Sequence, residues 1–119
     1  MIAVVPKTVI KGAGGFLEYT IYDGTTVNPP PLDLTGASAI FYCVCKEDPT
    51  KKFYGNMTVI NATLGQVNYE IQPTTDFPEV GTYEGEIVLD YGDPLPIKAK
   101  GIIINCVASL VDSFTPEGV

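Results

Sequence analysis

The feature that most constrains this sequence is a period-two alternation of apolar and polar residues, which clusters of Gly or Pro interrupt every eight to fifteen residues. The segment Gly65–Gln72 is the clearest example, because Val67, Tyr69 and Ile71 alternate with polar side chains. Successive side chains of a β-strand point to opposite faces, so this pattern predicts strands with one buried face. Short strands at this spacing are typical of a β-sandwich or barrel. The sequence therefore predicts an all-β protein.

Seven segments show this alternation or a continuous apolar run of strand length. The predicted strands cover residues 3–10, 16–22, 37–46, 53–61, 65–72, 82–91 and 97–107. Between the second and third strands, Pro29–Pro31 lack the amide hydrogens of a ladder, so we expect an extended crossing loop there. A chain of 119 residues fits one domain spanning 1–119, with short flexible ends at about 1–5 and 108–119.

The third predicted strand is apolar on both faces. One face carries Phe and Cys side chains, and the other carries Ile40, Tyr42 and Val44. A strand of a two-sheet domain usually has one polar face, so the second apolar face should be covered or bind a partner. Either the Pro29–Pro31 crossing loop or another protein could cover it. We take Ile40, Tyr42 and Val44 as candidate interface residues.

The stretch from Val80 to Leu89, VGTYEGEIVL, has the pattern of a structural corner. In Greek-key sandwiches a Tyr at the start of the penultimate strand often fills the core while its hydroxyl bonds the main chain of the preceding turn. Gly81 would supply the backbone freedom, and Tyr83 would be this Tyr. Glu84 and Glu86 then form the solvent face of the strand. They are not predicted to be a catalytic pair, because an open sheet face lacks the burial that general acid catalysis requires.

The last hairpin can also be given a register. If its loop is residues 92–96, antiparallel pairing places Tyr91 opposite Ile97 and Asp90 opposite Lys98. We expect the oppositely charged pair to contribute at most about 1 kcal/mol to stability.

Charge and composition weigh against several function classes. The net charge of −7 at pH 7 disfavours nucleic acid and anionic membranes, because like charges repel. His is missing from the chain, and with it the commonest general base and the most frequent zinc ligand. No Gly-rich phosphate loop or nucleophile elbow is present. We therefore predict a protein that is not an enzyme, with no catalytic, cofactor-binding or metal-binding residues and no nucleic-acid or membrane partner.

The three cysteines are expected to be buried thiols. Cys43 and Cys45 would share one face of a strand, where neighbours bridge poorly. We interpret Cys43, Cys45 and Cys106 as thiols of a protein made in a reducing compartment, with a disulfide or a metal pair as the alternative. The N-terminus has no basic leader followed by a long apolar run, so no secretory signal is expected.

Several of these segments recur together in one family. Residues 32–105 resemble the N-terminal domain of phage baseplate upper proteins and related tail-appendage modules. The similar segments, in order, are Leu32–Ala37 leading into Ile40–Val44, then Gly65–Tyr69, then Val80–Glu86.

The resemblance implies an immunoglobulin-like Greek-key β-sandwich of about seven antiparallel strands. It also implies a non-enzymatic building block of the virion, without cofactors, that is made in the host cytoplasm and docks on other virion structural proteins in a multi-copy assembly. Such a module could belong to a baseplate or tail, decorate a capsid or anchor a fibre.

A carbohydrate-binding or adhesin module of a bacterial surface is the alternative function. Sugar-binding sandwiches present exposed aromatic rings on which sugars stack, often Trp. This chain has no Trp, but Tyr22, Tyr54 and Tyr91 could take that role.

Overall fold

The computed structural model describes residues 7–24 and 27–108, and these residues form an all-β structure. The predicted strands 2 to 7 are confirmed, and each boundary agrees within two residues. Residues 3–6 of the first predicted strand lie outside the described residues, as do the predicted flexible ends at about 1–5 and 108–119, apart from residue 108. The strands are β1 (Lys7–Ile10), β2 (Gly15–Thr20), β3 (Ser38–Cys45), β4 (Lys52–Asn61), β5 (Gln66–Ile71), β6 (Gly81–Asp90) and β7 (Ile97–Val107).

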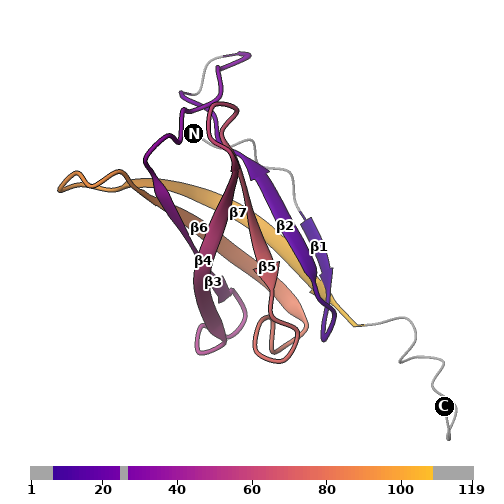
Figure 1. Cartoon of the computed structure of the whole chain (residues 1–119). Helices are drawn as coiled ribbons and strands as arrows, with labels where there is room; N and C mark the ends of the chain where they lie inside the picture. Colours follow the sequence, from indigo (N-terminus) through magenta and orange to yellow (C-terminus); the bar gives the residue numbers. More distant parts are fainter. Residues whose placement is uncertain (1–6, 25–26, 109–119) are drawn as a thin grey trace, which may run out of the picture.

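The seven strands form one continuous sheet in the order β1-β7-β6-β3-β4-β5-β2, and this sheet folds over on itself (Figure 1). The fold occurs along β4, which changes partner: residues 52–57 pair with β3, and residues 58–61 pair with β5. A register shift between Val59 and Asn61 accompanies this change, and such irregularities bend a strand. The two halves that face each other are consistent with the expected immunoglobulin-like Greek-key sandwich.

One pairing differs from the antiparallel expectation. β1 runs parallel to β7, with Lys7 opposite Ile104 and Ile10 opposite Val107. Every other strand pair is antiparallel. The alternation of side chains fixes which face of a strand is buried but carries no information about the direction of its neighbour. A parallel pair also has no hairpin loop that could reveal it in the sequence.

The inner faces of the two halves meet in a core rich in aromatic rings. Phe41 lies at its centre, fully buried, with its ring centroid 5.2 Å from that of Tyr69 across the sandwich. Phe77 packs edge-on against Phe53 at 4.7 Å and against Tyr83 at 5.0 Å, a geometry that aromatic pairs favour. The predicted inward faces of β5 and β6 are confirmed, because Val67, Tyr69, Ile71, Tyr83, Ile87 and Leu89 are all buried.

The loop between β2 and β3 does not cover the outer face of β3. Its described residues turn back along the end of β2, where the Asp23 amide donates to the Pro30 carbonyl and Tyr22 pairs with Pro31. Tyr42 on β3 remains 43% exposed. The prediction that Pro29–Pro31 could cover this face is therefore wrong for the described part of the loop.

The predicted register of the last hairpin is also wrong. Leu89 lies opposite Ile97 and Val88 opposite Lys98, so the register is displaced by two residues and Asp90 does not face Lys98. The Asp90 carboxylate instead accepts a hydrogen bond of 2.7 Å from the Gly92 amide. This local turn ends the pairing early, and the longer loop projects beyond the rest of the sheet (Figure 1).

Candidate functional site

The corner before β6 is structural, as the sequence predicts. Tyr83 is fully buried; its hydroxyl donates to the Glu79 carbonyl at 2.8 Å and accepts from the Glu79 amide at 3.1 Å. Gly81 adopts a φ of +156°, which L side chains rarely adopt. These observations confirm the predicted roles of Gly81 and Tyr83, and the buried Tyr83 side chain is not available to a ligand.

The hydrogen bonds of the buried Asp76 carboxylate, which we call the Asp76 lock, were not predicted from the sequence. Asp76 lies in the connection between β5 and β6 and is only 6% exposed. Its carboxylate accepts from the Tyr69 hydroxyl at 2.6 Å and from the Gln72 amide at 2.8 Å. The partners are an inward-facing Tyr and a strand-end amide, so only the folded connection brings them together.

The remaining predicted site residues, Ile40, Tyr42 and Val44, lie together on the outer surface of β3. We call this surface the outer β3 face and define it by these three residues with their neighbours Lys52 and Tyr54 on β4 and Glu84, Glu86 and Val88 on β6. Pairing in register on both sides of β3 produces the face, because paired residues point the same way. Ile40 and Val44 are half-buried and Tyr42 is exposed.

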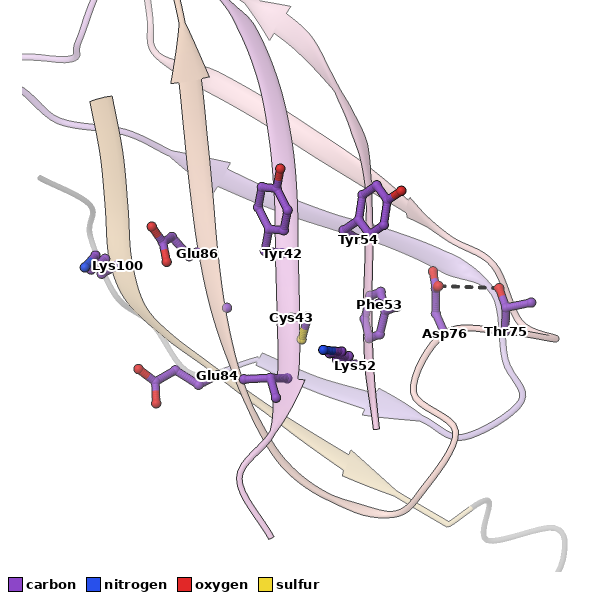
Figure 2. Close-up of a pocket in the computed structure, with 12 residues that line it drawn as sticks. Tyr42, Cys43, Lys52, Phe53, Tyr54, Thr75, Asp76, Glu84, Glu86 and Lys100 are labelled. Carbon is purple, nitrogen blue, oxygen red and sulfur yellow. Dashed lines mark hydrogen bonds between the residues drawn. The ribbon is translucent and has the colours of Figure 1, made fainter. Parts of the chain in front are cut away.

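Tyr42 and Tyr54 form a stacked pair at the centre of this face. Their ring centroids are 5.7 Å apart with an interplanar angle of 19°, and Tyr54 is 72% exposed. Figure 2 shows the two rings side by side. Stacking favours this orientation of both rings, which lowers the entropy cost of ordering them when a partner binds.

The charged residues next to the tyrosine pair lie on both sides of β3, with opposite signs on the two neighbouring strands. Lys52 lies on the β4 side, and Glu84 and Glu86 lie on the β6 side, with Lys100 beyond them (Figure 2). These residues and the tyrosine pair line a groove of about 860 Å³, which also reaches Thr75 and Asp76. Glu84 is exposed, as its predicted solvent-facing role requires, and Glu86 is half-buried.

A smaller cavity of about 320 Å³ lies where β4 and β5 diverge. Its lining is mostly polar and includes Asn56, Asn68 and Gln72, with the exposed rings of Phe16 and Tyr54 beside them. Tyr54 thus lines both hollows. The other tyrosines proposed as sugar platforms are held elsewhere: Tyr91 donates its hydroxyl to the Asp33 carbonyl at 2.7 Å, and Tyr22 is half-buried.

The three cysteines are free and buried, which confirms their predicted state. Burial raises the pKa of the Cys43 and Cys106 thiols, so they remain protonated and poorly nucleophilic near neutral pH. Within residues 7–24 and 27–108, no group of three or more His, Cys, Asp or Glu side chains is arranged to hold a metal ion. The same residues contain no helix long and apolar enough to cross a membrane.

The structure therefore separates the predicted site residues into two groups. Gly81 and Tyr83 build the corner, and Ile40, Tyr42 and Val44 build a surface. Sequence reasoning did not connect Lys52 and Glu84 to that surface. The short turn between β3 and β4 was the signal that could have placed Lys52 beside Val44.

Neither a protein-family model nor a curated protein sequence matches this chain. The resemblance to baseplate upper proteins therefore depends on the segments quoted above.

Proposed function

We propose that this protein is a non-enzymatic structural component of a phage particle that docks on other virion proteins through the outer β3 face. The observation that carries the proposal is the exposed pair Tyr42 and Tyr54, flanked along β3 by the half-buried side chains of Ile40 and Val44. Contiguous exposed apolar surface of this kind marks interaction sites on soluble proteins. The resemblance of residues 32–105 supports the virion as the location, in a baseplate, tail, capsid or fibre position.

The composition of the face fits a protein partner. Aromatic residues are enriched at the centre of protein interfaces, and charged residues are more common at the rim. Tyr42 and Tyr54 occupy the centre here, and Lys52, Glu84 and Glu86 surround them. A lasting interface buries about 1,200 Å² or more in total, so docking would extend beyond the central tyrosines to these rim residues.

Mass spectrometry of purified virions tests this function directly, with wild type and Tyr42→Asp compared in particles assembled in the host. We expect wild type in the particle and Tyr42→Asp depleted from it by about tenfold or more, because a buried unpaired carboxylate opposes docking. Phe16→Asp is the matched control, since Phe16 is also exposed but lies on β2. Circular dichroism should show that both variants keep the native fold. Particles without the wild-type protein would contradict the proposal.

Carbohydrate binding is the second candidate function, and the stacked, exposed Tyr42–Tyr54 pair is the observation that favours it. Sugars stack on such rings, and the polar cavity beside Tyr54 offers amide groups to hydroxyls. A glycan array decides between the two functions. Specific binding that Tyr54→Ala abolishes would support the adhesin alternative.

A further inference from the structure

The outer β3 face is complementary to itself, and we propose that its first occupant is a second copy of this chain. This inference rests on the docking role proposed above and names the partner. It starts from three rows of side chains that run across β4, β3 and β6. The rows are Lys52–Val44–Glu84, Tyr54–Tyr42–Glu86 and Asn56–Ile40–Val88.

The two ends of these rows carry different chemistry. The β4 ends are an ammonium, a phenol and an amide, whereas the β6 ends include two carboxylates. Lys52 and Glu84 are both exposed and pair with Val44 from its two sides. Figure 2 shows them on opposite sides of β3. They form no ion pair with each other, because the one ion pair among the described residues joins Lys51 to Glu79. Both charges are therefore free to meet a partner.

A twofold axis that runs along β3 between two copies brings opposite ends of the rows together. This axis places β4 of one copy over β6 of the other, since rotation about it exchanges the two sides of β3. Lys52 then faces Glu84 of the second copy, and Tyr54 can donate its hydroxyl to Glu86 of the second copy. Ile40, Tyr42 and Val44 meet their own copies on the axis, as in any isologous interface.

The alternative twofold axis, perpendicular to β3, gives a poor match. It would place β6 over β6 and bring Glu86 close to Glu86 of the second copy, while Lys52 would face Asn56. Like charges placed opposite each other in an interface repel and suppress that arrangement. Lys100 lies beside these glutamates and would offset part of the repulsion, but only the axis along β3 places Lys52 opposite a carboxylate. The charge pattern therefore favours the axis along β3. Packed sheets keep their strand directions within about 30° of each other, so the central rows stay aligned.

The net charge of −7 opposes association at long range. Charges separated by more than about 8 Å are largely screened at physiological salt. Lys52 and Glu84 of the second copy would be in direct contact in the proposed dimer and so would be screened less, and dimerisation should therefore be measured at about 0.15 M salt.

Sedimentation analysis of the full chain, from about 1 to about 100 μM, tests the inference. We expect a wild-type dimer. Lys52→Glu and Glu84→Lys should each raise the dimer Kd about tenfold or more, because each turns two symmetry-related attractions into repulsions. The double variant Lys52→Glu/Glu84→Lys restores both attractions, and its Kd should return to within about threefold of wild type.

Two charge reversals away from the face serve as controls: Glu70→Lys on β5 and Lys11→Glu after β1. Each makes the same kind of charge reversal as a test variant, at an exposed position. Neither should change the dimer Kd. A wild-type protein that stays monomeric at the highest concentration would overturn the inference. So would a double variant that dimerises no better than the single ones, or controls that weaken the dimer equally.

The outcomes also separate this inference from the proposed function. A monomer that enters virions and needs Tyr42 to do so contradicts the dimer and supports the docking role. A dimer that is missing from virions supports the dimer and contradicts the virion role. A monomer that binds a glycan through Tyr42 and Tyr54 contradicts both.

Discussion

The side chain of Tyr83 contacts both the core and the corner that precedes β6. Its ring packs against Phe77, and its hydroxyl bonds both main-chain groups of Glu79. The corner is therefore fixed by the same residue that fills the space beneath it. Gly85, two residues further along β6, fills no space in the core. The ring of Phe41 occupies the position that a side chain at residue 85 would need.

Removing the Tyr83 hydroxyl should destabilise the protein without changing its fold. Tyr83→Phe leaves the Glu79 carbonyl and amide without the hydroxyl that bonds them in the part-buried corner, and we expect the free energy of unfolding to fall by about 1–2 kcal/mol. Urea denaturation followed by circular dichroism measures the change. Tyr54→Phe is the control, because Tyr54 is largely exposed and its hydroxyl is free to bond water. Equal stability of Tyr83→Phe and wild type would contradict the assigned role of the corner.

A methyl group at Gly85 should not fit. A Cβ there would lie 2.9 Å from Cε1 of Phe41 and 3.3 Å from Cβ of Ile102, and both neighbours are buried in the core. We expect Gly85→Ala to lower the free energy of unfolding by about 1–3 kcal/mol through overpacking. Gly14→Ala is the matched control, because nothing lies within 4 Å of the Cβ built there. Thermal denaturation of both variants measures the difference, and equal melting temperatures would refute the crowding.

At the scale of elements, the connection between β5 and β6 is held by Asp76. This carboxylate joins the end of β5 to the loop that precedes the corner, through Tyr69 and Gln72. The core residue Phe77 follows at once, with a φ of +51° that non-Gly residues seldom adopt. The lock and the buried ring together hold the connection against the core.

Loss of the Asp76 carboxylate should cost more than loss of a similar carboxylate at the surface. Asp76→Ala leaves the buried Tyr69 hydroxyl and the part-buried Gln72 amide without their acceptor, and we expect a loss of about 2–4 kcal/mol in the free energy of unfolding. Asp48→Ala also removes two hydrogen bonds, to the amide and hydroxyl of Thr50, but these are exposed. Water can replace them, so the loss there should be much smaller than at Asp76. Guanidinium titrations that give equal losses would contradict the importance of burial.

The elements themselves could be predicted from the sequence, because burial of one face is a local property of each strand. The inward residues of β5 and β6 and the role of Tyr83 follow from alternation and a known turn pattern. The predicted register of β6 and β7 was wrong by two residues. The Asp90–Gly92 turn depends on local geometry that alternation does not encode. The parallel β1–β7 pair joins segments far apart in the chain, so no local pattern reveals it. The change of partner along β4 and the hydrogen bonds of Asp76 join nearby segments, but they depend on the geometry of the folded connections, which alternation does not encode.

At the scale of the whole molecule, buried tyrosine and cysteine side chains make the stability of the fold sensitive to high pH. Burial raises the pKa of Tyr83 to about 12, and it also raises the pKa of Tyr19, Tyr69 and the Cys43 thiol. In the unfolded chain a Tyr loses its proton near pH 10. Above that pH the unfolded state releases protons that the folded state keeps, so stability decreases as pH rises.

We therefore expect the free energy of unfolding to fall steadily as pH rises from about 9 to about 12. Urea denaturation at a series of pH values measures this trend. Tyr83→Phe, although less stable at neutral pH, should lose less stability over the same range because one raised pKa is removed. A flat pH profile for wild type, or an unchanged slope in the variant, would contradict the contribution of buried tyrosines.

The parallel pairing of β1 with β7 determines how the molecule would respond to mechanical tension. Lys7 begins β1 opposite Ile104, and Val107 ends β7 opposite Ile10. A pull on the chain before Lys7 and after Val107 therefore acts along the two strands in opposite directions. The hydrogen bonds between them would be loaded in shear, all at once, and would not open one after another as in a zipper. A module mounted by both ends would resist extension through this short ladder.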